Sequence, residues 1–139
     1  MDTLTKSERS ARMALVRSKG TAVELAARRI VHGLGYRYRL HGADLPGKPD
    51  MVLPSRRAVI FVHGCFWHRH PRCRLARLPK SRLDFWVPKL EANRARDVRN
   101  LRRLRRAGWR PLVIWECELS DPAGLKLRIK RFLIAKGGT

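Results

Sequence analysis

The sequence predicts an α/β fold in which helices flank a mixed β-sheet. Three observations lead to this class. Short apolar runs typical of strands alternate with longer segments of helical periodicity, glycine and proline separate these segments, and their order is helix, strand, strand, strand, helix, strand, helix. At 139 residues, 44% of them hydrophobic, the chain can bury one core. We therefore expect a single domain over residues 21–139, preceded by a weakly helical arm over residues 1–20.

Three helices are predicted from apolar side chains that recur on one face. The first covers residues 21–34 and ends at Gly35, and the second is long and basic, covers residues 83–107 and ends at Gly108. The third covers residues 125–133.

Four segments are predicted as strands. Residues 36–40 alternate apolar or aromatic side chains with arginine, and residues 51–53 and 58–62 are apolar runs whose short Pro-Ser-Arg-Arg connection is typical of an antiparallel hairpin. The segments 58–62 (AVIFV) and 111–115 (PLVIW) contain no polar residue, so we expect both strands to be buried.

The charge balance indicates the class of partner. The chain carries 32 Lys and Arg against 11 Asp and Glu, a formal net charge of +21, which would make a compact domain repel itself unless a polyanion were its usual neighbour. Nucleic acid is the favoured partner. A ribosomal or nucleoid protein would show the same balance, and an anionic membrane surface would also attract it, so charge alone does not define the activity.

Cysteine content indicates a reducing compartment. Three cysteines cannot all pair, the first twelve residues (MDTLTKSERSAR) contain no apolar signal segment, and no apolar run approaches the length of a membrane span. We expect a cytoplasmic protein that is not held in a membrane. In that setting cysteines near histidines favour a metal site over disulfides.

The densest polar cluster follows the AVIFV strand directly. Cys65, His70 and Cys73 offer two thiolates and an imidazole, and Cys117, just after the PLVIW strand, is the candidate for a fourth ligand. If the two strands are neighbours, their ends coincide and the four ligands close a tetrahedral, structural zinc site. The alternative is that Cys117 is an ordinary buried cysteine.

Several other polar residues are candidates for chemistry, each with a simpler alternative. Asp50 opens a strand in an acid-poor chain, although aspartate is also common at turns. Glu24 lies three residues after Thr21, a spacing typical of a capping box, so the simpler alternative is that its carboxylate caps the helix and has no role in chemistry. His63 and His68 belong to the segment of residues 63–73, called the metal loop below, but are not needed as zinc ligands, and either can act as a general base or acid.

Aromatic and basic residues provide candidate DNA contacts. Phe66 and Trp67 lie within the metal loop, and a core role and a role as wedges between base pairs are equally open. The arginines of the long helix can form a solvated face, but with the net charge of +21 we favour phosphate contacts.

With these residues in place, the chain resembles the very short patch repair endonucleases. The matching segments run from about Arg9 to Cys117: RSxxM at residues 9–13, LPGKPD at 45–50, FVHGCFWH at 61–68, the Phe-Trp pair at 85–86, NRARD at 93–97 and GWRPLVIWEC at 108–117. The last roughly twenty residues carry no motif of this family. A generic basic protein would not be expected to combine FVHGCFWH with PGKPD and VIWEC.

The resemblance implies a restriction-endonuclease-like fold, a structural Zn²⁺ and a Mg²⁺-dependent nick on the 5′ side of the thymine in a G:T mismatch. Such a mismatch arises by deamination of 5-methylcytosine. It implies a bacterial, nucleoid-associated monomer that acts on double-stranded DNA, with other repair proteins as possible partners.

The resemblance also implies roles for individual residues. Asp50 and the main-chain carbonyl of Val62 would bind Mg²⁺, and His68 would activate water. His63, Glu24 and Asp97 would assist through hydrogen bonds and waters. The DNA-contacting residues would be the following: Met13 in the arm, Phe66, Trp67, Trp86, Lys89, Arg94, Arg96 and Arg99.

Two other classes of function remain as alternatives. A zinc-stabilised nucleic-acid-binding module without catalysis would make Asp50 and His68 dispensable. A zinc hydrolase is disfavoured, because the four implied zinc ligands leave no position for a water.

Overall fold

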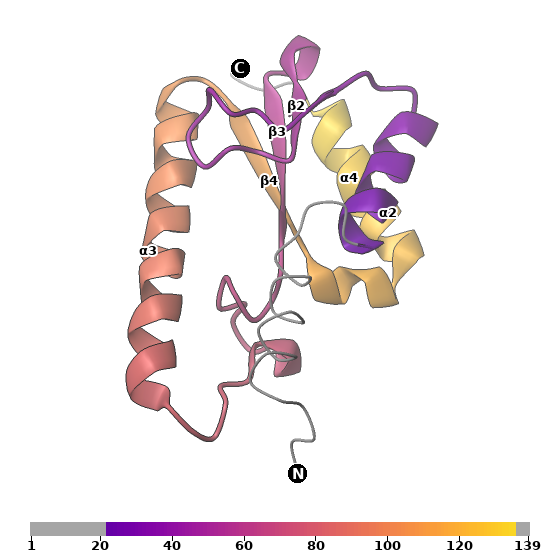
Figure 1. Ribbon diagram of the computed structural model, residues 1–139. Helices are drawn as coiled ribbons and strands as arrows, with labels where there is room; N and C mark the ends of the chain where they lie inside the picture. The colour runs from indigo at the N-terminus through magenta and orange to yellow at the C-terminus, as the bar shows by residue number, and fades with distance from the viewer. Residues whose placement is uncertain (1–21, 136–139) are drawn as a thin grey trace.

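The computed structural model describes residues 22–135, which fold into three layers (Figure 1). A four-stranded sheet forms the middle layer. Helix α3 (Leu83–Arg106) covers one face, and α2 (Ala22–Gly33) and α4 (Pro122–Ile134) cover the other. The predicted mixed α/β class is confirmed. The predicted arm, with Met13, and the cap residue Thr21 lie outside the described residues.

The sheet contains both strand directions. Its order is β1 (Arg39–Leu40), β2 (Met51–Leu53), β3 (Ala58–His63) and β4 (Arg110–Trp115). β1 pairs with β2, and β2 with β3, in antiparallel orientation, and the second of these pairs confirms the predicted hairpin. β3 and β4 are parallel. A parallel pair needs a long crossover, and the chain between β3 and β4 contains the whole of α3.

Side chains of β2 and β3 are buried on both faces of the sheet. Ala58 and Ile60 of β3 pack with α2 and α4, and Val59 and Phe61 pack towards α3, where Leu104 is fully buried. This two-sided burial explains why the AVIFV segment contains no polar residue. The predicted burial of the PLVIW strand holds only on one face, because β4 buries Leu112 and Ile114 and leaves Pro111, Val113 and Trp115 half-buried.

Two predicted boundaries were wrong. The strand predicted at residues 36–40 is reduced to Arg39–Leu40, because the Tyr36 N–H still bonds to the Val31 carbonyl of α2 and the three-residue β2 offers β1 only Met51 and Val52 as partners. Helix α4 begins at Pro122, three residues before the predicted start. Asp121 caps it by accepting a hydrogen bond from Gly124 N–H at 3.1 Å.

The parallel pairing of β3 and β4 positions the candidate site. His63 at the end of β3 lies opposite Trp115 at the end of β4, so the loop after β3 and the 3₁₀ turn η3 (Glu116–Ser120) meet at one edge of the sheet. This is the neighbour relation on which the expected metal site depended. Within residues 22–135 no helix is long and apolar enough to cross a bilayer.

Candidate active site and metal centre

A cavity of about 200 Å³ lies at this edge of the sheet. Lys48 and Asn100 contribute to its polar lining. Four further polar side chains come from three parts of the fold: Asp50 precedes β2, His63 and His68 lie at and after the end of β3, and Asp97 lies on α3. These four side chains, far apart in sequence, were predicted as site residues, and the fold brings them to one cavity.

Asp50 is held rigidly at the cavity wall. Its Oδ2 accepts a hydrogen bond from the Val62 N–H at 2.6 Å. The pKa of Asp50 is raised from 3.8 to about 7. Burial is the largest cause and the neighbouring Glu24 carboxyl adds to it, whereas the Val62 hydrogen bond and the Arg28 guanidinium lower the pKa. A carboxylate in this position is therefore destabilised until a positive charge approaches it.

His68 and Asp97 form a close pair. His68 Nδ1 lies 2.5 Å from Asp97 Oδ2, which couples the metal loop to α3. A carboxylate accepts hydrogen bonds, so Nδ1 carries the proton in this contact and Nε2 is the ring nitrogen that can accept one.

His63 differs from His68 in its surroundings. Its ring is buried and stacks on the ring of His68 with a centroid distance of 3.8 Å. The pKa of His63 is lowered to about 3, mainly by burial and also by the nearby His68, with Asp97 acting in the opposite direction, so His63 is uncharged at neutral pH. The sequence left both histidines open as a general base or acid, and the burial of His63 disfavours it for that role.

Glu24 approaches Asp50 from α2. The Glu24 side chain is buried, lies 3.5 Å from the Arg28 guanidinium, and has a ligand atom within 4.8 Å of those of Asp50 and His41. The sequence analysis missed His41. Its N–H donates to the Asp50 carbonyl at 3.0 Å, and its place in the Gly- and Pro-rich loop before Asp50 was the only available signal.

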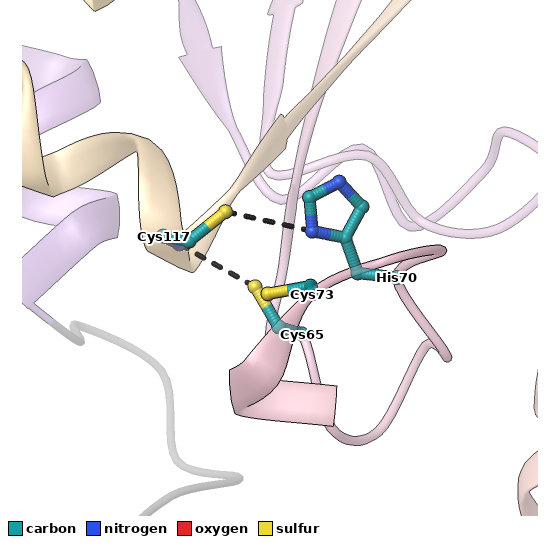
Figure 2. Close-up of side chains that lie close together, drawn as sticks. All are labelled: Cys65, His70, Cys73 and Cys117. Carbon is teal, nitrogen blue, oxygen red and sulfur yellow. Dashed lines mark hydrogen bonds between the residues drawn. The ribbon is translucent and has the colours of Figure 1, made fainter. Parts of the chain in front are cut away.

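The four expected metal ligands lie together. Cys65, His70, Cys73 and Cys117 each offer one ligand atom, and these atoms all lie within 4.8 Å of one another (Figure 2). Cys117 Sγ lies 3.5 Å from His70 Nδ1, and the Cys117 N–H donates to Cys65 Sγ at 3.4 Å (Figure 2). This Cys₃His cluster could hold a metal ion.

Local structure holds these ligands in place. The His70 N–H donates to the Cys65 carbonyl at 3.0 Å, and the His70 ring stacks on Trp115 of β4 with a centroid distance of 4.1 Å. Burial raises the pKa of Cys65 to about 12. A thiolate at this position therefore requires a cation beside it.

Aromatic side chains form a cluster next to the cavity. Phe66, Trp67 and Trp86 lie with ring centroids 5.2 to 5.9 Å apart, and Lys89 Nζ lies 5.8 Å from the Trp67 ring. Trp67 is 8% exposed, and Phe66 and Trp86 are half-buried. The predicted DNA-contacting arginines of α3 are exposed: Arg94, Arg96 and Arg99.

Comparisons with known proteins identify a family to which this chain is similar. The family described as "DNA mismatch endonuclease Vsr" matches residues 1–74. The chain is 56% identical over 132 residues to the type II nicking enzyme V.XorIIP of Xanthomonas oryzae pv. oryzae, covering 95% of this chain and 96% of that protein. It is 38% identical over 144 residues to DNA mismatch endonuclease Vsr of Escherichia coli, covering 99% of this chain and 91% of that protein. The resemblance seen in the sequence is confirmed, and the chain belongs to the Vsr family of DNA mismatch endonucleases.

Proposed function

We propose that this protein is a DNA endonuclease of restriction-endonuclease-like fold that nicks duplex DNA 5′ to the thymine of a G:T mismatch in the presence of Mg²⁺. The single observation that carries the proposal is the cavity in which Asp50 lies with the His68–Asp97 pair. Phosphodiester hydrolysis needs a carboxylate that fixes a cation against the phosphate and a base that takes a proton from water. The names of the relatives, a mismatch endonuclease and nicking enzymes, support the same reaction and substrate.

The residues at the cavity fit Mg²⁺. A hard cation prefers oxygen ligands, and Asp50 supplies a carboxylate at the cavity whose pKa is raised chiefly by burial, so that a bound cation would favour its charged form. We propose Asp50 and the Val62 main-chain carbonyl as the protein ligands. When bound, Mg²⁺ would offset the negative charge that develops on the phosphate during hydrolysis.

His68 is the proposed general base. The Asp97 carboxylate fixes its tautomer through Nδ1, so Nε2 takes the proton from the attacking water, and Asp97 then stabilises the positive imidazole ring. His63 supports this step by remaining uncharged against the face of His68, because a second positive ring 3.8 Å away would oppose protonation of the first. Glu24 assists from the far side of Asp50.

Zinc is the proposed occupant of the Cys₃His cluster. Three thiolates and an imidazole are the donors that Zn²⁺ prefers, and four protein ligands fill a tetrahedral shell. The ion would join the metal loop to the turn after β4, a structural role that holds His68 at the cavity.

The aromatic cluster is the proposed mismatch reader. Phe66, Trp67 and Trp86, with Met13 from the arm, would insert at the mismatch, and Lys89 and the exposed arginines of α3 would contact phosphates. Phe66 is the more accessible of the two neighbouring loop aromatics, because Trp67 is 8% exposed.

A nicking assay tests this function directly. Two duplexes that differ only in G:T against G:C, each labelled on both 5′ ends, are incubated with the protein with and without Mg²⁺. We expect one nick, 5′ to the mispaired thymine, only in the G:T duplex with Mg²⁺. Tight binding without cleavage of either duplex would support the non-catalytic binding module instead.

A further inference from the structure

A second cavity, of about 500 Å³, lies beside the metal centre. His70 and Cys73 form part of its wall. Five further lining residues are arginines: Arg69, Arg72, Arg74, Arg77 and Arg94. No carboxylate is among its lining residues within the described part of the chain.

Most of this positive charge is uncompensated. Arg69 donates to the Ala76 carbonyl at 2.8 Å and lies 3.8 Å from Glu91. The other four arginines are exposed, and none of them forms an ion pair with a carboxylate within residues 22–135. Like charges gathered around one hollow repel one another unless an anion neutralises them.

The cavity is built on the same elements as the active site. The metal loop carries His68 into the catalytic cavity and Arg69 into the basic cavity, and α3 contributes Asp97 to the first and Arg94, one turn earlier, to the second. The backbone at Arg69 and Arg72 has positive φ values of 53° and 56°, and the metal ligands on either side hold these turns.

We propose that this basic cavity binds a backbone phosphate of the DNA substrate at a position away from the cleaved bond. The proposal rests on the proposed function, because it takes duplex DNA as the substrate. Guanidinium groups bind phosphodiester oxygens in a bidentate geometry, and several of them around one hollow match a chain of phosphates better than a single small anion. Occupancy of the metal centre then controls DNA affinity as well as stability, because it holds the arginines in place.

The first test is the affinity of the full chain for a labelled duplex without Mg²⁺, measured by fluorescence anisotropy at several salt concentrations. Arg74→Gln/Arg77→Gln should bind about tenfold more weakly and flatten the log–log salt slope by about two. The control is Lys130→Gln/Arg131→Gln on α4, which removes the same charge from exposed positions across the sheet. It should lose less than about twofold. Equal losses in the two variants would overturn the proposal.

The second test locates the phosphate. Single phosphates of the duplex are replaced in turn by neutral methylphosphonates, and we expect the parent protein to lose affinity at a position to which Arg74→Gln/Arg77→Gln is insensitive. Arg94→Gln, outside the metal loop, should be insensitive at the same position, and it decides the case if the loop variant proves to have lost its metal. The proposal would be overturned if every variant were as sensitive as the parent to methylphosphonate at each position, even if the cavity bound inorganic phosphate.

The outcomes separate this proposal from the proposed function. If one phosphate is mapped to these arginines but the protein does not nick the G:T duplex, the proposal for the basic cavity is supported and the proposed nuclease function is contradicted. If the protein nicks the G:T duplex specifically but no phosphate depends on these arginines, the nuclease function is supported and the basic cavity is contradicted.

Discussion

At the scale of residues, His68 Nδ1 lies 2.5 Å from Asp97 Oδ2, which leaves Nε2 free to act as the proposed general base. We therefore predict how the rate of nicking depends on His68 and on pH. His68→Ala should slow nicking by roughly a hundredfold or more, the scale of a lost general base. Its rate should also lose the acid limb of the pH profile, because the ring must be neutral to accept the proton. His32→Ala, on the exposed side of α2, is the matched control and should nick as the parent does. An acid limb retained in His68→Ala would assign the base to another group.

A second prediction concerns Asp50 in the absence of Mg²⁺. The pKa of Asp50 is about 7 in the folded protein against 3.8 for an ordinary aspartate, so its contribution to stability is fully present below pH 3.8 and is lost as the pH rises through 7. Asp50→Asn removes the charge and should melt higher than the parent at pH 8, by roughly 5 °C, with little difference at pH 4. Thermal melts at both pH values check this. Equal differences at the two pH values would show that Asp50 is not held in an unfavourable charged state.

At the scale of elements, the Cys₃His cluster, the proposed zinc site, joins the loop after β3 to the turn after β4. Cys117→Ser removes one of four ligands, so metal content and melting temperature should fall together. Metal analysis and a thermal melt of the same preparation provide the two readouts. One metal ion per chain retained by the variant would remove Cys117 from the ligand set.

The aromatic cluster predicts how matched and mismatched DNA are distinguished. Unstacking costs on the order of a few kcal/mol per step, and less at a wobble pair that is already weakened. Phe66→Ala/Trp67→Ala should therefore lose the preference for G:T and keep most of its affinity for any duplex. Binding titrations with G:T and G:C duplexes measure this preference. An equal loss on both duplexes, together with a lower melting temperature, would identify the pair as core residues.

The elements that could be predicted from the sequence are those whose pattern of apolar side chains, and whose terminating glycine, lie within the segment itself. Helix α3 ends two residues before Gly108, whose φ of 88° is the left-handed conformation that glycine adopts readily, and β3 and β4 contain the two apolar runs AVIFV and PLVIW. The Cys117 ligand could be predicted as well, because the ends of two neighbouring parallel strands coincide.

The parts that could not be predicted depend on distant partners. Residues 36–38 alternate like a strand, but β2 is too short to pair with them. His41 carries no pattern that links it to Asp50, and the approach of Glu24 from α2 follows from helix packing against the sheet. The basic cavity was missed because its arginines, spread over residues 69–94, were read as general charge and not as the lining of one hollow.

At the scale of the whole molecule, helices cover both faces of the sheet, and one of them, α3, contributes to both cavities. Helices α2 and α4 pack against one face of the sheet with a large apolar cluster, and α3 covers the other face (Figure 1). Residues of α3 and of the metal loop line both cavities. With a net charge of +21, the chain would attract the proposed DNA substrate, and the metal loop and α3 carry both the arginines of the basic cavity and the proposed catalytic groups.

The central claim is that Asp50 carries cleavage and not binding. The measurement is single-turnover nicking of a G:T duplex with Mg²⁺, together with the affinity for that duplex without Mg²⁺, for the parent and for Asp50→Ala. We predict that nicking is abolished while affinity is unchanged or higher, because removal of a negative charge beside DNA relieves repulsion. Nicking by Asp50→Ala at near the parent rate would contradict the account and leave a DNA-binding module as the better description of this chain.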